Sequence, residues 1–404
     1  MLLFLSFRQW DIIQINRSLT LINFPKSLLS KLEQRQQHNA LRELPLANKS
    51  VDFSSNDYLG FAKSEIIFDK THQLLEARNF KINGGTGSRL LSGNHEIYSE
   101  TETFLANFHQ VETALIFNSG YDANVGFFGC VPQRNDIILY DELAHASIRD
   151  GIKMSLAKSV KFAHNDLDDL EKKIHQVQTN DFENEIYIVT ESVFSMDGDS
   201  PNLEKMVEIS EKYKCLLVVD EAHALGVFGE NGFGLVQDLK LQDKIFARIM
   251  TFGKGLGCHG AAILGSENLK SYLVNFARSF IYTTGLSPHS VATILIAYQE
   301  LEKASATIEK LRQNIVFFNQ QKNILGLKPL FVRNKSAIQS AIIPGNETVK
   351  TIAEKLQKAG FDVKPILSPT VPDGQERLRF CIHSYNSETE IETVLKLLSE
   401  FIHE

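Results

Sequence analysis

The sequence has 404 residues, with 42 lysines and arginines against 49 aspartates and glutamates, so the net charge is 42 − 49 = −7. A hydrophobic share of 43% and a charged share of 23% are typical of a globular protein of about two domains and argue against intrinsic disorder. The mildly acidic balance disfavours binding to nucleic acid or to an anionic membrane surface, because both attract basic proteins.

The four cysteines, Cys130, Cys215, Cys258 and Cys381, are far apart and form no C-x-x-C pair. This spacing fits neither a disulfide framework nor a structural zinc site, and it favours reduced thiols in the cytoplasm. The apolar runs fall short of the roughly 18 residues that a membrane helix needs, so no membrane span is predicted. Residues 1–24 lack the basic segment and the cleavage site of a signal peptide and are interpreted as an N-terminal extension.

Along the chain, residues 25–43 alternate charged and apolar positions at helical spacing, which predicts a surface helix that Pro45 ends. From about residue 95, short apolar runs alternate with amphipathic stretches. The runs predict strands at 114–117, 137–140, 186–190, 216–219, 249–252 and 261–264. The amphipathic stretches predict helices at 96–108, 167–178 and 202–213. This alternation is typical of an α/β fold with a mostly parallel sheet and helices on both faces.

The pattern changes near residue 286. Helical periodicity runs from about 288 to 324, and a strand at 337–343, a helix at 347–359 and a strand at 378–382 follow. These elements predict a smaller C-terminal α+β domain. The predicted parts are an N-terminal extension and helix (1–51), a large domain (52–286) and a small domain (287–404).

Three short motifs match other functions but lack the required context. Gly255–Gly260 spells G-x-G-x-x-G, yet a predicted strand follows where a dinucleotide fingerprint needs a helix. Asp220-Glu221-Ala222-His223 spells a helicase box, but the chain has no G-x-x-x-x-G-K-[S/T] phosphate loop. His95-Glu96 lacks the second histidine of H-E-x-x-H, so no metal site is predicted.

Polar side chains follow several predicted strands at the points where the strands end. Asp220 ends the strand at 216–219, His223 comes three residues later, and Lys254 follows the strand at 249–252. In open α/β sheets, ligands bind outside the carboxyl ends of the strands. Each residue alone has a structural alternative: Asp220 could cap a helix, His223 could be a core histidine, and Lys254 could be a solvated loop cation.

Together these residues match the needs of pyridoxal phosphate. Its aldehyde requires a lysine amine, and its pyridinium nitrogen requires an acidic partner. Its phosphate needs N–H groups and hydroxyls at a helix N-terminus, which the segment Ser119-Gly120-Tyr121 and Thr251 offer. A flat side chain must cover the ring, and His145 is available.

Seven sequence blocks resemble those of a known protein family. They are FSSNDYLG at 53–60, GGTGSRLLSG at 84–93, DELAHASIRDG at 141–151, ESVFSMDGD at 191–199, DEAHALGVFGENG at 220–232, TFGKGLGCHGAA at 251–262 and PTVPDGQERLR at 369–379. Through them the chain resembles the α-oxoamine synthases, most closely their 8-amino-7-oxononanoate synthase branch, from about residue 40 to the C-terminus. The resemblance implies an aminotransferase-like fold type I and a homodimer with shared active sites.

The resemblance also implies roles for individual residues. Lys254 would form the Schiff base with the cofactor, Asp220 would pair with the pyridine nitrogen, and His145 would stack on the ring. Further cofactor contacts are implied for Ser119, Gly120, Tyr121, Ser195, His223, Thr251, Thr283 and Thr284, the last two toward the phosphate held by the neighbouring subunit. Substrate contacts are implied for Arg42, Asn56, His145, Thr370 and Arg379. Arg379 would clamp the amino-acid carboxylate at two points.

The implied reaction is a decarboxylative condensation of L-alanine with pimeloyl-CoA or pimeloyl-acyl carrier protein, a step of biotin biosynthesis. Some family members carry an Arg three residues before the Thr at 370, where this chain has Leu367, so the group that recognises the far end of the acyl chain is not identified.

Two alternatives to this function stay open. One is a sister enzyme that joins glycine or serine to another acyl-CoA, of the 2-amino-3-ketobutyrate ligase or serine palmitoyltransferase type. The other is a catalytically silent partner subunit, which the presence of Lys254 disfavours.

Overall fold

The computed structural model describes residues 24–42, 44, 49–178 and 184–404. The chain divides into two compact units, Met1–Leu46 and Ala47–Glu404. The first unit contains helix α1 (Lys26–Gln37), none of whose side chains is buried. The predicted helix at 25–43 was too long, because Asn39 adopts a left-handed φ of 51° just beyond α1. Pro45 and, apart from Phe24, the predicted extension at 1–24 lie outside the described residues.

A seven-stranded sheet forms the centre of the second unit. Its strands are β2 (Thr113–Phe117), β3 (Ile137–Asp141), β4 (Lys158–Phe162), β5 (Ile186–Glu191), β6 (Leu216–Asp220), β7 (Ala247–Thr251) and β8 (Ala261–Gly265), in the order β2-β8-β7-β6-β5-β3-β4. Strand β8 is antiparallel to both neighbours, and the other pairs are parallel. This confirms the mostly parallel sheet and all six predicted strands. The sequence prediction missed β4, an edge strand whose exposed lysines hide the apolar pattern.

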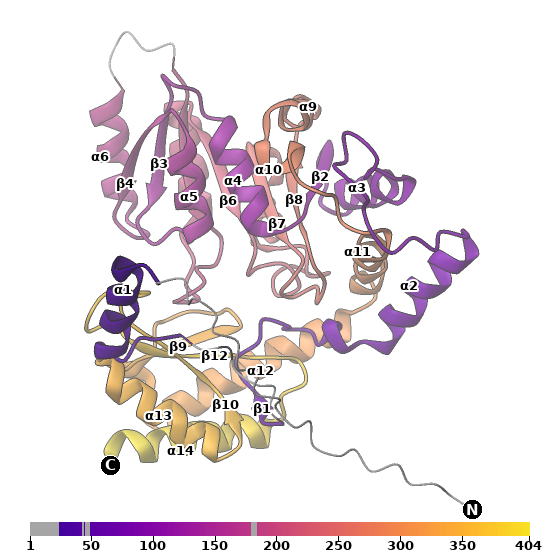
Figure 1. Ribbon diagram of the computed structural model, residues 1–404. Coiled ribbons are helices and arrows are strands. Elements are labelled where there is room, and N and C mark those ends of the chain that lie inside the picture. Colours follow the sequence, from indigo (N-terminus) through magenta and orange to yellow (C-terminus); the bar gives the residue numbers. More distant parts are fainter. Residues whose placement is uncertain (1–23, 43, 45–48, 179–183) are drawn as a thin grey trace, which may run out of the picture. The chain divides into compact units, whose positions relative to one another are not determined.

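Helices cover both faces of this sheet (Figure 1). The helices and short 3-10 turns of this part are η1 (Phe61–Lys63), α2 (Glu65–Ala77), α3 (Glu96–Phe108), α4 (Gly120–Cys130), α5 (Ala146–Met154), α6 (Leu167–Val177), α7 (Leu203–Tyr213), α8 (Leu235–Asp238), η2 (Gln242–Lys244), α9 (Glu267–Phe276) and α10 (Arg278–Ile281). Helices α4, α5, α9 and α10 share one hydrophobic core with the sheet, and α6, α7 and α8 share another. Alternate residues of one strand enter the two cores: Ile138 joins the first, and Leu139 joins the second.

The C-terminal region carries a second, antiparallel sheet. Its elements are α11 (Pro288–Leu301), α12 (Ser305–Ile324), η3 (Lys328–Leu330), β9 (Ile338–Ile342), α13 (Asn346–Lys358), β10 (Phe361–Asp362), β11 (Lys364–Ile366), β12 (Arg377–Cys381) and α14 (Glu388–His403). The sheet order is β11-β12-β9, and β10 pairs with the N-terminal strand β1 (Val51–Asp52). The predicted helical run at 288–324 is two helices, because the chain turns after Leu301 without a glycine or proline to signal it.

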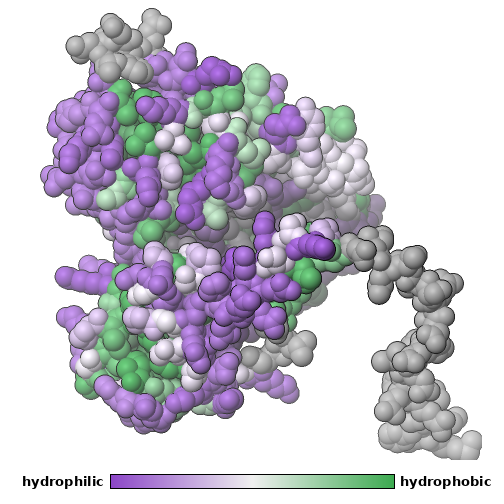
Figure 2. Space-filling model, turned by 60° about the vertical axis from the view of Figure 1, so that its left-hand side comes forward, coloured by the Kyte–Doolittle hydropathy of each residue, from purple (hydrophilic) through white to green (hydrophobic). Residues whose placement is uncertain are grey.

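The domain boundaries near residues 51 and 286 stay predictions. Contacts cross both of them: β1, at the first boundary, pairs with β10, and α11 packs against α2 and α3 across the second. Hydrophilic side chains cover most of the face shown in Figure 2, with small hydrophobic patches between them. Within the described ranges, no helix combines the length and apolar character needed to cross a membrane.

A buried ion pair holds β7 to the turn after β6. Arg248 Nε donates to Glu221 Oε2 at 2.8 Å, and Glu221 Oε1 accepts from the backbone N–H of Val236 at 2.9 Å. Only 2% of the Arg248 side chain and none of the Glu221 side chain is exposed. Glu221, the second residue of the helicase-like motif, therefore pairs with a cation in the core.

We expect Arg248→Met to lower the free energy of unfolding by about 3–5 kcal/mol, because the Glu221 carboxylate would remain buried without its cation. Urea unfolding of the purified protein measures this change. Lys303→Met is the matched control, since Lys303 pairs with Glu300 while 63% of its side chain is exposed, and its loss should cost about 1 kcal/mol or less. Equal losses in the two variants would contradict the argument.

Candidate active site

Three neighbouring strands place polar residues at one edge of the large sheet. In the parallel register of β5, β6 and β7, Glu191 lies opposite Asp220, and Asp220 lies opposite Ile249. The carboxyl ends of the strands therefore bring Glu191, Asp220 and Thr251 to the same edge. This is the edge at which an open α/β sheet binds its ligands.

Asp220 is fixed by two donors. Its Oδ1 accepts from the backbone N–H of Ala222 at 2.9 Å, and its Oδ2 accepts from Asn124 Nδ2 at 2.8 Å. Asn124 lies in α4 with 2% exposure and also donates to Ser147 Oγ at 3.0 Å. Turns, and no helix, follow Asp220, so it is not a helix cap. The sequence reasoning missed Asn124, because a polar residue inside a helix carries no strand-end signal.

Lys254 is not a solvated loop cation. It lies in the glycine-rich loop between β7 and β8, where Nζ is 2.9 Å from His223 Nε2. Burial lowers the pKa of Lys254 to about 8, although Asp220 and Glu191 oppose the shift. His223 is 4% exposed, and burial followed by the Lys254 charge lowers its pKa well below the ordinary value.

Glu191 is a second residue that the sequence reasoning missed. It is 3% exposed, and its Oε1 accepts from the backbone N–H of His145 at 2.6 Å. Burial and the neighbouring Asp220 raise the pKa of Glu191 to about 8. The His145 side chain is solvent-exposed and lies near enough to Lys254 and Asp220 to interact with their charges. The signal for Glu191 was present, since it directly follows a predicted strand as Asp220 does.

The N-terminus of α4 meets the end of β7. Ser119 caps the helix by accepting from the backbone N–H of Asp122 at 3.1 Å. A Cβ at Gly120 would lie 2.4 Å from Thr251 Oγ1, so the helix backbone and that hydroxyl are in contact only because residue 120 is glycine. Free N–H groups beside a hydroxyl suit a phosphate.

The other residues predicted to bind the cofactor differ in what they contact. Tyr121 is 51% exposed and donates to Asp150 Oδ2 at 3.1 Å. Asn118 Nδ2 donates to Thr283 Oγ1 at 3.1 Å and to the Thr284 carbonyl at 2.6 Å, so both threonines lie beside the start of α4 in their own chain. Ser195 lies in the loop after β5 and forms no hydrogen bond with the other described site residues.

Two of the predicted substrate residues, Arg379 and Asn56, form a hydrogen bond with each other. Arg379 Nη2, on β12, donates to Asn56 Oδ1 at 2.8 Å. Its Nε is buried and has no partner among the described residues, which leaves a donor for a carboxylate. Thr370 lies in the turn after β11, where its N–H donates to the Leu367 carbonyl at 2.8 Å. Arg42 lies in the first compact unit, Met1–Leu46.

The residues present fit pyridoxal phosphate. The Gly120 backbone and Thr251 suit the phosphate, Asp220 keeps lone pairs for a protonated ring nitrogen, and Lys254 supplies an amine of lowered pKa. The unpartnered Nε of Arg379 suits the carboxylate of an amino acid.

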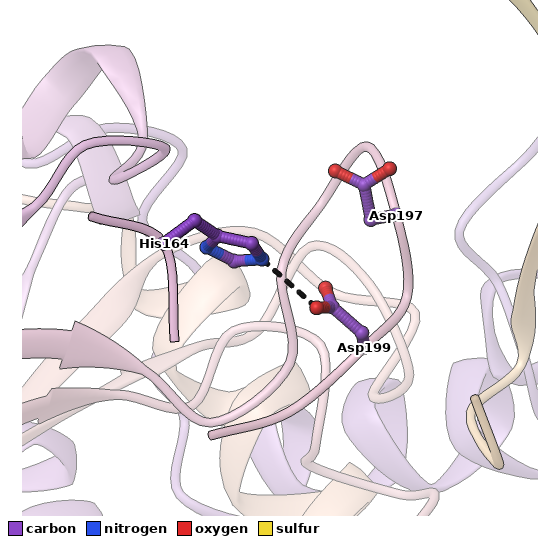
Figure 3. A group of neighbouring side chains, drawn as sticks. All are labelled: His164, Asp197 and Asp199. Carbon is purple, nitrogen blue, oxygen red and sulfur yellow. Dashed lines mark hydrogen bonds and ion pairs between the residues drawn. The ribbon is translucent and has the colours of Figure 1, made fainter. Parts of the chain in front are cut away.

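A second cluster joins His164, in the loop after β4, with Asp197 and Asp199, in the loop after β5 (Figure 3). His164 Nδ1 is 2.9 Å from Asp141 Oδ1, His164 Nε2 is 2.8 Å from Asp199 Oδ2, and Asp197 pairs with Arg377. Burial opposes the charged ring, but the hydrogen bonds to Asp141 and Asp199 raise the pKa of His164 to about 10. In the structure, hydrogen bonds and an ion pair therefore hold the group of His164, Asp197 and Asp199 together.

This cluster predicts a contribution to the free energy of unfolding that depends on pH. A folded pKa of about 10, above the ordinary 6.5, means that the stabilisation is complete below pH 6.5 and is lost as the pH rises to 10. We expect His164→Gln to cost roughly 1.5–3 kcal/mol at pH 6 and much less above pH 10. Denaturant unfolding at the two pH values measures the difference. The exposed His175 supplies the control His175→Gln, and a pH-independent loss in His164→Gln would contradict the assignment.

Comparison with known proteins gives consistent matches. The family model for aminotransferase class I and II matches residues 48–398. An 8-amino-7-oxononanoate synthase from Emericella nidulans is 38% identical over 397 residues, which cover 93% of this chain and 95% of that protein.

Solved structures also resemble the chain over most of its length. A serine palmitoyltransferase from S. paucimobilis with bound PLP superposes with a TM-score of 0.84 at 25% identity, covering 93% of this chain and 97% of that one. An 8-amino-7-oxononanoate synthase from Francisella tularensis superposes with a TM-score of 0.74 at 29% identity, covering 88% of this chain and 99% of that one.

Proposed function

The chain belongs to the aminotransferase class I and II family, and we propose that it condenses L-alanine with a pimeloyl thioester to give 8-amino-7-oxononanoate, CO2 and the free thiol carrier, as in biotin biosynthesis. The observation that carries the proposal is the placement of the buried Lys254 amine. It lies near enough to Asp220 and Arg379 for both charges to shift its pKa. The proposed proton carrier, Lys254, therefore lies near both the proposed partner of the cofactor ring, Asp220, and the proposed partner of the amino-acid carboxylate, Arg379.

Lys254 is the proposed proton carrier. With a pKa of about 8, its amine takes up and returns a proton near neutral pH with little energetic cost in either direction. The proton exchanged is the one on the α-carbon of alanine. His223 Nε2, which lies 2.9 Å from Nζ, holds the amine in place.

Bound pyridoxal phosphate supplies an electron sink for the carbanion that forms at the α-carbon. Asp220, fixed by Asn124 and by the Ala222 N–H, would hold the proton on the ring nitrogen. Ser119, Gly120, Tyr121 and Thr251 would bind the phosphate, Ser195 and His223 would bind the ring hydroxyl, and His145 would cover the ring.

Arg379 is the proposed clamp for the alanine carboxylate, because its free Nε and the Asn56-bound Nη2 lie on one guanidinium. Asn56 would add a side-chain amide contact, and Arg42 and Thr370 are further proposed substrate contacts. The carrier is either CoA or an acyl carrier protein, and Leu367 leaves the recognition of the distal end of the acyl chain open.

We also propose a homodimer, in which Thr283 and Thr284 reach the phosphate held by the neighbouring subunit. Exposed apolar side chains beside these threonines support it: Tyr282 is 73% exposed and Leu91 is 85% exposed. Their segments are in contact, because Gly285 N donates to the Gly87 carbonyl at 2.9 Å. The proposed compartment is the cytoplasm, which the four free cysteines support.

We expect the purified protein to gain a visible absorption band on addition of pyridoxal phosphate. Lys254→Ala should lose this band, because Lys254 is the amine that lies beside His223 and near Asp220 in the described part of the chain. Absorbance titration with the cofactor measures it. Lys322→Met is the matched control, since burial also lowers the pKa of Lys322 to about 8, but its Nζ donates to Gln339 in the C-terminal region. A colourless parent protein would refute the cofactor assignment.

A substrate panel tests the reaction itself. Alanine, glycine and serine are each combined with pimeloyl-, acetyl-, succinyl- and palmitoyl-CoA and with pimeloyl-acyl carrier protein, and release of the free thiol is followed. We expect alanine with a pimeloyl thioester to give at least about tenfold higher kcat/KM than any other pair, an advantage worth about 1.4 kcal/mol. A higher value for glycine or serine with another acyl-CoA would indicate a sister enzyme. No turnover by a coloured protein would indicate a silent homologue.

A further inference from the structure

A continuous hydrogen-bonded chain connects Lys254 with Arg379. Lys254 Nζ is 2.9 Å from His223 Nε2, and His223 Nδ1 is 2.7 Å from the hydroxyl of Tyr58. Tyr58 Oη donates to Asn56 Oδ1 at 3.3 Å, and Arg379 Nη2 donates to the same oxygen at 2.8 Å. Tyr58, at the centre of the chain, is 0% exposed and has no role in the functional assignment above.

The chemistry of the end groups fixes the direction of every hydrogen bond. A protonated lysine and a guanidinium can only donate, and an amide oxygen can only accept. Tyr58 must therefore donate to Asn56, which leaves its oxygen to accept from His223 Nδ1–H, and His223 Nε2 then accepts from Lys254. This arrangement requires a neutral His223. Burial and the nearby Lys254 lower its pKa well below the ordinary value, which meets that requirement.

We propose that Tyr58 is a positioning residue for the condensation: its hydroxyl fixes the Nδ1–H tautomer of His223 and, through Asn56, links the proton carrier Lys254 to the carboxylate clamp Arg379. The inference rests on the proposed function, in which Lys254 moves the α-proton and Arg379 holds the carboxylate. Tyr58 touches neither substrate nor cofactor in this scheme and acts through His223 and Asn56.

Removing the hydroxyl has two consequences that differ in kind. His223 Nδ1–H would lose its buried acceptor, so the ring would shift toward the Nε2–H tautomer, which cannot accept from a lysine ammonium. The pKa of Lys254 should then fall. Asn56 Oδ1 would also lose one of its three donors and keep Arg379 Nη2 and the weaker Cys381 thiol. The Asn56–Arg379 pair would then hold the alanine carboxylate less firmly.

The test compares Tyr58→Phe with the parent protein in two measurements that do not use turnover. The first is the pH dependence of the rate at which cofactor-free protein captures pyridoxal phosphate, which reports the protonation of the Lys254 amine. Charges and titratable groups near this amine are Asp220, Glu191, His145, His223, Arg379 and Cys381, and the variant retains all of them. We expect the midpoint to move to lower pH.

The second measurement is the dissociation constant of alanine for the cofactor-loaded protein without acyl thioester, followed by the change in visible absorption. We expect it to rise roughly 3- to 10-fold, the range for loss of one neutral hydrogen bond. Tyr298→Phe is the matched control. Tyr298 is also 0% exposed, and its hydroxyl lies 3.0 Å from His109 Nε2, so it should change stability without moving either readout.

A Tyr58→Phe protein with the parental midpoint and the parental alanine affinity overturns the inference. If this variant fails to fold, Asn56→Ser tests the same link, and unchanged alanine affinity in Asn56→Ser also overturns it. A parent protein that captures no cofactor would instead refute the proposed function, so the two failures are distinguishable.

Discussion

Desolvation at the carboxyl ends of β5 and β6 constrains the chemistry of the site. Glu191 and Asp220 are buried there, and burial shifts the pKa of Glu191 and of the neighbouring Lys254 toward their uncharged forms. The charge of Lys254 offsets part of this cost for Glu191, although the charge of Asp220 adds to it. Hydrogen bonds from the His145 N–H to Glu191 and from Asn124 to Asp220 stabilise the two carboxylates further. Burial moves the pKa of the Lys254 amine down and that of the Glu191 carboxyl up, each to about 8. Burial therefore brings the pKa values of both groups toward neutral pH.

The segment after β6 serves the core and the site at once. Asp220 and His223 point toward the site, where they meet Asn124 and Lys254. Glu221, between them, points into the interior and binds Arg248 and the Val236 N–H. Successive residues at the end of a buried strand face opposite sides. Asp220 and Glu221 of the helicase-like motif therefore point in different directions, and each has its own partner. The ion pair in the core holds the turn whose other residues form the site.

Strong local patterns predicted much of this structure, and contacts between distant segments supplied the rest. Helix α3 begins and ends where the apolar spacing predicted, and the strand-end rule located Asp220, His223 and Lys254. The same rule did not identify Glu191, although it applies there. Asn124 and Tyr58 are beyond such reasoning, because their roles come from the packing of α4 and of residues 53–60 against other segments. The His164 cluster joins the end of β3, the loop after β4 and the loop after β5, and sequence periodicity does not predict such contacts.

Contacts with segments of the large sheet help β12 to fix the position of Arg379, the proposed carboxylate clamp. Arg377 and Arg379 are two residues apart on β12 and therefore lie on the same side of the strand. Arg377 pairs with Asp197 in the loop after β5, and Arg379 binds Asn56 in the segment before α2. Ser340, the cross-strand neighbour of Arg379, donates to the Met196 carbonyl in that same loop. These contacts connect β9 and β12 with the loop after β5 and with the segment before α2, so they fix the position of Arg379, the proposed clamp for the amino-acid carboxylate.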